Sequence, residues 1–156
     1  MPGTLKISDI QNFQNVDAES LIYTYLGREH IQISNKTNGC YYIPSIDFIN
    51  MVPFKHFNSS EEYYSTFFHE INQSTEVKTR LNKLNFSNDI FGSKAYSEEE
   101  LVAEISASYI CNFLRLQTPD LITNSIAFLE GWSRKLKNDK MFFYKSIKKP
   151  KQRLIL

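Results

Sequence analysis

The pattern of apolar and polar positions predicts three short strands early in the chain. Residues 30–34 alternate between apolar and polar side chains, which is typical of a half-buried strand. The turn sequence NKTNG leads into a second extended run at 40–43, and a third run at 47–52 is stopped by Pro53. Because only short loops separate these runs, we expect them to pair as a small antiparallel sheet.

Helical patterns flank the predicted sheet on both sides. Residues 17–27 have the spacing of a short helix, with the first aspartate as N-cap and the final glycine just past the C-terminal end. A serine cap followed by two acids begins a helix over residues 59–74. After a loop at 85–96, a capping box at Ser97 opens one long helix, and another covers 119–146. Strands that precede the main helices predict an α+β fold.

The length and composition indicate a single globular domain over residues 1–156. Hydrophobic residues make up 42% of the chain and charged residues 22%, which is ordinary for a globular protein. No apolar run approaches the roughly 18 residues of a membrane span, and the N-terminus lacks the layout of a secretory signal. The two cysteines, Cys40 and Cys111, are too few to indicate a disulfide framework. We therefore expect a cytoplasmic protein with reduced thiols and no membrane partner.

The net charge of +1 conceals a strongly basic C-terminal end. From Arg134 onward there are nine lysines and arginines and one aspartate, whereas residues 1–133 hold nine basic and sixteen acidic residues. The basic stretch 137–153 is a candidate contact for single-stranded DNA, because such stretches attract phosphate groups. A solvated helix face followed by a basic tail at 147–156 explains the same charges without a partner.

The sequence HEINQ, from His69 to Gln73, differs at one position from the HExxH motif of zinc peptidases. Residues four apart lie on one face of a helix, so two histidines at this spacing can bind one zinc ion. The glutamate between them, here Glu70, accepts a proton from the metal-bound water. Gln73 replaces the second imidazole with a neutral amide, which is a weaker zinc ligand. The motif therefore predicts a metal site with reduced affinity for zinc.

A third ligand is expected from the acidic segment at residues 98–104. Glu100 and Glu104 are four residues apart and share one face of the predicted helix. We favour Glu100 as the metal ligand and Glu104 as the residue that orients another ligand, although the spacing also permits the reverse. Glutamates at the start of a helix also occur for a simpler reason, because they interact favourably with the helix dipole.

Several further segments occur in an order that is known from one protein family. They are YIPSIDFINM at 42–51, YYSTFFHE at 63–70, Thr75 with Arg80 and Leu81, FGSKAY at 91–96, EELVAE at 99–104, and Trp132 with Leu136, Lys137 and Asp139. Together they resemble the metallopeptidase domain of ArdC-type antirestriction proteins, over about residues 17–146. This family is a zincin-like group that also occurs in polyvalent proteins of phages and conjugative elements.

The resemblance implies a zincin-like fold with a zinc ion, in which His69 is the first ligand and Glu70 the general base. It also implies a third ligand from the glutamates of residues 99–104 and a protein or peptide substrate. Two positions depart from the family pattern: Gln73 stands where the second histidine is expected, and Glu76 where a glycine usually follows the threonine. The single-stranded-DNA-binding domain that precedes the peptidase in this family has no counterpart in the sequence, so we expect the peptidase half alone.

Two functions are consistent with these residues. In the first, a metal ion held by His69, Glu100 and the Gln73 amide activates a water molecule. Glu70 then accepts the proton of that water, and a peptide bond is hydrolysed with impaired efficiency. In the second, the domain is a non-catalytic binding module that engages a host defence protein or single-stranded DNA on behalf of a mobile element. Because a missing imidazole lowers both metal affinity and Lewis acidity, we expect an impaired or inactive enzyme.

Overall fold

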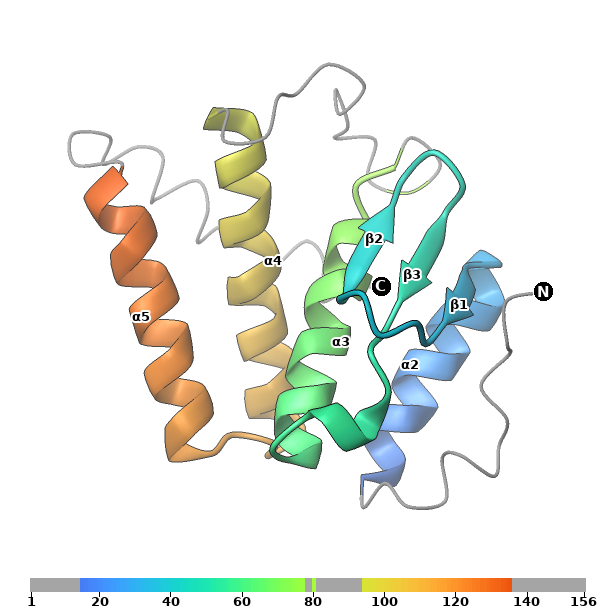
Figure 1. Cartoon of the computed structure of the whole chain (residues 1–156), viewed down its shortest axis with the longest axis horizontal. Coiled ribbons are helices and arrows are strands. Elements are labelled where there is room, and N and C mark those ends of the chain that lie inside the picture. The colour runs from blue at the N-terminus through green and yellow to red at the C-terminus, as the bar shows by residue number, and fades with distance from the viewer. Residues whose placement is uncertain (1–14, 78–79, 81–93, 136–156) are drawn as a thin grey trace.

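The computed structural model describes residues 15–77, 80 and 94–135, which form a small sheet and a set of helices (Figure 1). In chain order, the elements are helix α2 (Val16–Glu29), strands β1 (Gln32–Ser34), β2 (Tyr41–Ile43) and β3 (Phe48–Asn50), the 3-10 helix η1 (Phe54–His56), and helices α3 (Ser60–Ser74), α4 (Lys94–Phe113) and α5 (Pro119–Lys135). The predicted α+β class is confirmed, and the sheet precedes the helix that carries the HExxQ motif.

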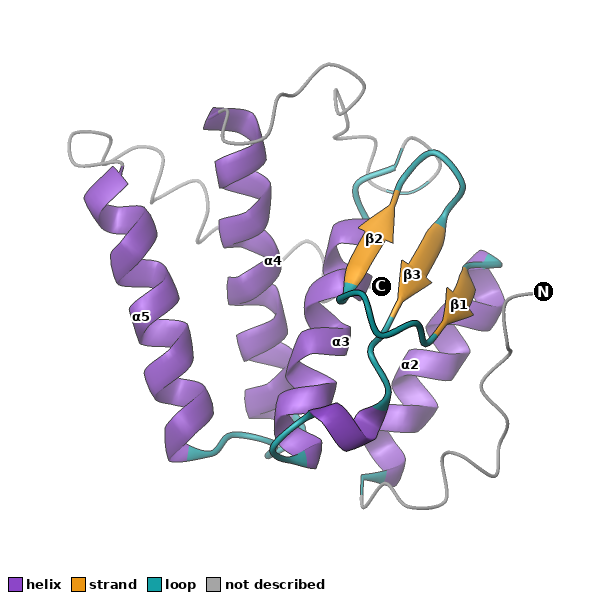
Figure 2. Cartoon of the chain, viewed as in Figure 1, coloured by secondary structure: helices purple, strands orange, loops and turns teal. Residues whose placement is uncertain are grey.

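The three strands form a mixed sheet in the order β1-β3-β2, so the prediction of an antiparallel sheet is wrong for one of its two pairings. Strand β3 pairs antiparallel with β2 but parallel with β1. After β1, the chain crosses to the other edge of the sheet and forms β2. It then returns and forms β3 between the two edge strands (Figure 2). Alternation of apolar and polar residues has the same period in both kinds of pairing, so it does not reveal strand direction.

Asn50, at the end of β3, holds the connection between β1 and β2 in place. Its fully buried side chain accepts the Ser34 hydroxyl at 2.7 Å and the Lys36 N–H at 2.8 Å. Its amide nitrogen donates to the carbonyl oxygens of Lys36 and Gly39 at 3.0 and 2.6 Å. Gly39 has a φ of 120°, a conformation that glycine adopts without steric cost. A single buried amide therefore satisfies the backbone groups that shape this loop.

Helix α2 begins and ends outside its predicted limits. Its N-cap is Asn15 rather than Asp17, because the Asn15 side chain accepts the Ala18 N–H at 2.8 Å. Gly27 lies inside the helix, and the C-cap is His30, which adopts the left-handed conformation at φ 57°. Glycine is the usual residue at such a position, so the sequence signal pointed three residues too early.

Helix α4 begins at Lys94, so the predicted start at Ser97 is wrong. Residues 94–96, predicted as the end of a loop, are helical, and the rest of that loop (85–93) lies outside the described residues. A serine followed by three glutamates is favourable anywhere in the first turns of a helix, because acids interact with the positive end of the dipole. The capping signal therefore identified the helix but not its first residue.

The starts of α3 and α5 follow the sequence signals. The Ser59 hydroxyl accepts the Glu62 N–H at 3.1 Å and so caps α3, as predicted. Thr118 caps α5 in the same way, by accepting an N–H of the first turn at 3.2 Å. Helix α5 is described as far as Lys135, and its predicted continuation over 136–146 lies outside the described residues.

Helix α3 lies between the sheet and α4, with α5 beyond α4, and it is therefore buried on most of its surface (Figure 1). The side chains of Tyr64, Phe67 and Phe68 are each 1% exposed and pack in one core with Ile22 of α2 and Ile49 of β3. Because α3 is buried in this way, the polar residues in its second half lie in the interior of the domain.

None of the helices in the described ranges is both long and apolar enough to cross a membrane.

A buried arginine joins the sheet to the ends of α2 and α3. The Arg80 side chain is 4% exposed and bonds to Asp47 at 2.6 Å, to Glu29 at 2.9 Å and to the Ser74 carbonyl oxygen at 2.8 Å. The Tyr42 hydroxyl donates to the same Asp47 carboxylate at 2.8 Å. Arg80 therefore fixes the turn between β2 and β3, and through it the position of Tyr42 on the strand that faces α3.

Candidate metal centre

Helices α3 and α4 bring the predicted site residues together. His69 and Gln73 share one face of α3 because they are four residues apart. Glu100 and Glu104 are related in the same way on α4, which packs against α3. The His69 Nε2 atom lies 3.4 Å from Glu100 Oε2, so the two helices present their polar side chains to a shared space. The prediction that His69 and Glu100 face one cleft is confirmed.

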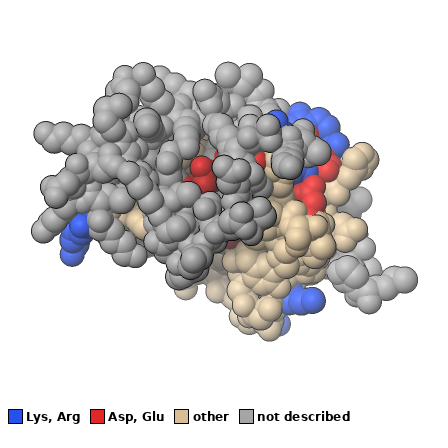
Figure 3. All heavy atoms as spheres, turned by 90° about the horizontal axis from the view of Figure 1, so that it is seen from above, with Lys and Arg blue, Asp and Glu red and all other residues tan. Residues whose placement is uncertain are grey.

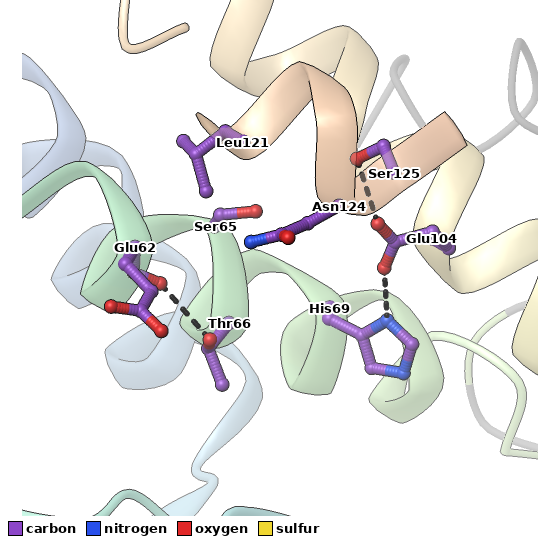
Figure 4. A pocket seen from close by; sticks show the side chains of 8 residues that line it. All are labelled: Glu62, Ser65, Thr66, His69, Glu104, Leu121, Asn124 and Ser125. Carbon is purple, nitrogen blue, oxygen red and sulfur yellow. Dashed lines mark hydrogen bonds and ion pairs between the residues drawn. The ribbon is translucent and has the colours of Figure 1, made fainter. Parts of the chain in front are cut away.

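The His69 imidazole lies between two carboxylates. Its Nδ1 atom is 3.2 Å from Glu104 Oε2, and its Nε2 atom is 3.4 Å from Glu100 Oε2. The second oxygen of Glu104 accepts the Ser125 hydroxyl of α5 at 3.0 Å, which extends the network to a third helix (Figure 4). Burial alone would lower the pKa of His69, but the hydrogen bonds with Glu100 and Glu104 raise it to about 10. The two carboxylates therefore favour the protonated form of the ring.

Gln73 closes the space between His69 and Glu100. Its amide nitrogen donates to Glu100 Oε1 and lies 3.2 Å from His69 Nε2. The Gln73 amide nitrogen and the His69 Nε2 atom each approach a different oxygen of the Glu100 carboxylate. The amide and the ring together satisfy this carboxylate, so the protein's own side chains complete the network.

Glu70 points to the other side of His69, toward the sheet. Its side chain is only 6% exposed, and its Oε2 atom has no hydrogen-bond partner among the described residues. Burial raises the pKa of Glu70 to about 7, an effect that the charge of His69 opposes and the charge of Glu100 adds to. A carboxyl group with this pKa exchanges a proton readily near neutral pH, which is the property of a general base.

The edge strand β2 borders the cavity on the Glu70 side. This cavity has a volume of about 340 Å³ and is lined by Cys40, Tyr41, Tyr42, Pro44, His69, Glu70, Gln73 and Glu100. An edge strand therefore borders the cleft, because β2 is one of the two outer strands of the described sheet. The two tyrosines were not predicted as lining residues.

A second cavity, of about 270 Å³, lies on the α5 side of His69 (Figure 4). Its lining residues are Glu62, Ser65, Thr66, His69, Glu104, Leu121, Asn124 and Ser125. Asn124 and Ser125 lie on α5. A motif of the family was found in this helix from the sequence, but no site residue was expected on it. Nothing in the sequence distinguished Ser125 from the other serines, because its role depends on how α4 and α5 pack.

The donor atoms around His69 do not fit the zinc ion that the motif implies. Within the described part of the chain, no three histidine, cysteine, aspartate or glutamate side chains converge on a point where a metal could bind. The third group near His69 and Glu100 is the Gln73 amide, which directs its nitrogen rather than its oxygen toward them. An amide N–H₂ group is a donor of hydrogen bonds and not a metal ligand. The site is thus built as a hydrogen-bonded network.

Comparisons with known proteins agree with the fold and the order of the motifs. The zincin-like metallopeptidase family matches residues 20–149 of the chain. The antirestriction protein ArdC of plasmid R388 is similar in structure in its Mn(II)-bound form, with 30% identity and a TM-score of 0.64. Its metal-free form gives 31% identity and a TM-score of 0.61. Both comparisons cover 85% of this chain, but 49% and 47% of the respective ArdC chains.

Two curated sequences are also similar to the chain. The uncharacterized protein y4eC of Sinorhizobium fredii is 29% identical over 122 residues, which is 78% of this chain and 39% of that protein. The DNA primase TraC of Escherichia coli is 29% identical over 110 residues, which is 68% of this chain and 10% of the primase. The chain thus spans less than half the length of each of these relatives. The ordered motifs, the fold and these matches show that the chain belongs to the zincin-like metallopeptidase family and contains the domain that ArdC antirestriction proteins share.

Proposed function

We propose that this chain is the metallopeptidase-type domain of an antirestriction protein from a mobile element, and that its site has lost the chemistry of a zinc peptidase. The similarity to ArdC of plasmid R388 supports the antirestriction role. One observation carries the second part: the Gln73 amide donates to Glu100 at the position where a second zinc-binding imidazole is expected. The domain then acts by binding its partner and not by cleaving it.

The cleft retains the parts that a binding function needs. Strand β2 is an edge strand, so an extended segment of a partner protein can pair with its free backbone groups. Strand pairing supplies affinity without reading the sequence of the partner, while the cavity beside β2 receives a side chain. A protein segment in extended conformation is therefore the partner that this geometry suits best.

The remaining site residues have roles that do not require a metal. His69 neutralises part of the charge of Glu100 and Glu104, and Ser125 orients Glu104 toward the ring. We assign Glu104 as the residue that positions His69, because it contacts Nδ1, the ring nitrogen that does not face Gln73. Glu100 and His69 would be the first two ligands in a variant that binds zinc. Glu70 would be its general base.

Elemental analysis of the purified protein tests this proposal. After dialysis against low-micromolar zinc, the wild-type chain should carry far less than one zinc ion per molecule, because the amide and one imidazole form a weak donor set. It should also fail to cleave a denatured protein substrate such as casein at a rate above that of a Glu70→Gln variant. One tightly bound zinc per chain, together with cleavage that Glu70→Gln abolishes, would refute the proposal.

A contact with single-stranded DNA is a second candidate function. The described residues show no continuous basic surface on the face seen in Figure 3, where basic and acidic side chains are scattered. The candidate contact therefore rests on the sequence of 137–153, which lies outside the described residues. One of the similar proteins, TraC of Escherichia coli, is a DNA primase, which supports a link to DNA for that relative.

A further inference from the structure

A wide apolar groove runs along α2, α3 and α4, separate from the metal centre. It has a volume of about 570 Å³ and shares no lining residue with either of the cavities beside His69. Its walls come from α2 and α4, and α3 lies between these two helices (Figure 1). Arg28 is the only charged residue among the described residues that line it. The groove is therefore a feature of the domain that the metal centre does not explain.

Large apolar side chains along this groove are exposed to water. Phe113, at the end of α4, is 85% exposed, while Leu21 of α2 is 46% and Tyr109 of α4 is 40% exposed. All three residues line the groove. Apolar side chains that are exposed singly need no explanation, but a group of them in one place is typical of an interaction surface. We therefore expect a partner to cover this groove.

The row of α2 residues beside the groove carries one charge at each end. Asp17, Leu21, Thr24 and Arg28 are separated by four, three and four residues, which places them in one line along the helix. All four are exposed, and the last three line the groove. The two charged residues are about 16 Å apart along the helix axis. The row is thus negative near the start of α2, uncharged in the middle and positive in the last turn.

This row is complementary to a second copy of itself that runs in the opposite direction. A twofold axis between Leu21 and Thr24 makes the α2 helices of two copies antiparallel. Asp17 of each copy then lies opposite Arg28 of the other copy, whereas a parallel arrangement would bring like charges together. Twofold symmetric contacts, in which each pair of residues occurs twice, are the commonest in soluble homo-oligomers. The charge pattern therefore favours a second copy of this chain as the partner.

We propose that the groove and the exposed row of α2 form a twofold interface between two copies of this chain. Burial of Leu21, Tyr109 and Phe113 supplies most of the affinity, because these side chains lose their contact with water. The charged ends of the row set the orientation of the two copies and contribute less to the affinity, since exposed ion pairs add little free energy.

Arg28 can make the contact across the interface without losing its own contacts. Its Nε atom lies 2.8 Å from Glu29 Oε1, and its guanidinium carbon lies 5.6 Å from the centre of the Tyr25 ring. A guanidinium group has five N–H donors and can bond to a second carboxylate at the same time. The contacts with Glu29 and Tyr25 therefore orient Arg28 beside the groove, where Asp17 of the other copy would meet it.

Sedimentation velocity at increasing concentrations of the full chain tests the interface, with EDTA present to exclude association through metals. Phe113→Asp places a charge in the apolar contact and should raise the dissociation constant of the dimer at least about tenfold. Ile126→Asp is the matched control, because Ile126 is 51% exposed on α5 and does not line the groove. It should leave the dissociation constant unchanged. Both positions are exposed, so thermal unfolding should show two folded variants.

Two charge reversals test the antiparallel orientation. Asp17→Lys and Arg28→Glu each bring like charges together in the twofold pair, so each variant alone should associate at least about tenfold more weakly than the wild type. In an equimolar mixture, each variant offers the charges that the other lacks. The mixed dimer should therefore form with an affinity close to that of the wild type. A mere loss of folding in either variant could not produce this recovery.

Three results would overturn the proposed interface. A wild-type chain that stays monomeric up to about 1 mM would show that the groove serves a different partner. A dimer that Phe113→Asp does not weaken would use another surface, and so would one that the mixture of charge variants does not restore. If a charge variant does not fold, the comparison of the wild type with Phe113→Asp decides. None of these results bears on the proposed function, which the zinc content of the protein tests independently.

Discussion

Replacing Gln73 with histidine should convert the hydrogen-bonded network into a zinc site. The Gln73 side chain already reaches to 3.2 Å from His69 Nε2 and contacts Glu100, so an imidazole at position 73 projects to the same space. The donor set then becomes two imidazoles and one carboxylate, which is a known catalytic zinc set. The gain of a full ligand in place of an amide should raise zinc affinity by several orders of magnitude.

The size of the effect can be worked out for a thermal assay. Zinc present at 100 times its dissociation constant stabilises the folded variant by about 2.7 kcal/mol. For a domain of this length, each kcal/mol shifts the melting temperature by roughly 2–4 °C, so zinc should raise it by roughly 5–10 °C. Without zinc the variant should be less stable than the wild type by about 1 kcal/mol, because the bond from the amide to Glu100 is lost.

Differential scanning fluorimetry with zinc or EDTA, supported by elemental analysis, measures both effects. Gln73→Leu is the matched control, because it also loses the amide bond but offers no ligand, and its melting temperature should not respond to zinc. If the Gln73→His variant cleaves peptides, adding Glu70→Gln should abolish cleavage and leave zinc bound. A Gln73→His variant that binds zinc no better than the wild type would refute the reasoning, since Glu100 and His69 would then not form a usable pair of ligands.

Three further predictions concern stability and DNA binding. The pKa of Glu70 is raised from an ordinary 4.5 to about 7, so the stability that its neutral form contributes is present below about pH 4.5 and is lost as the pH rises through 7. In urea titrations, Glu70→Gln should therefore raise the free energy of unfolding at pH 8 by up to about 3 kcal/mol and change it little at pH 4.5. Arg80→Met should lower the free energy of unfolding by about 3–5 kcal/mol, because it leaves Asp47 and Glu29 without their buried partner. A loss below about 1 kcal/mol in the same titrations would show that the contacts of Arg80 with Asp47 and Glu29 do not stabilise the fold. If residues 137–153 contact single-stranded DNA, the affinity for DNA measured by fluorescence anisotropy should fall steeply with salt. The affinity should be lost when three lysines of this stretch, Lys148, Lys149 and Lys151, are replaced with glutamate. An unchanged affinity would show that this stretch is only a solvated basic tail.

Local sequence signals predicted the elements better than their arrangement. The helix that carries His69 was predicted from its serine cap to its last turn, because the cap and the helical spacing both depend on neighbouring residues. The start of α4 and the end of α2 were misplaced, because a serine is favourable throughout a first turn and a histidine replaced glycine at the C-cap. The direction of β1 relative to β3 was also missed, because it depends on a pairing across the sheet.

The candidate site shows the same division between local and long-range information. The spacing of residues along α3 and α4 predicted that His69 and Glu100 lie close together, as they do. It left open whether Glu100 or Glu104 is the metal ligand. The contact between Glu104 and the far ring nitrogen follows from how the helices pack, and so does the bond from Ser125. That Gln73 donates to Glu100 was not predictable either, because an amide can present its oxygen or its nitrogen.

The identity of residue 73 decides how the interface between α3 and α4 remains stable without a metal. Glu100 and Glu104 lie between these helices, and buried carboxylates need either positive charge or hydrogen-bond donors to offset the loss of water. Protonated His69 supplies the charge to both, and the Gln73 amide supplies the additional donor to Glu100. A neutral histidine at position 73 would offer one donor at most, and a protonated one would repel the His69 imidazolium. Glutamine is therefore a residue that suits the interface between α3 and α4 when no metal is bound.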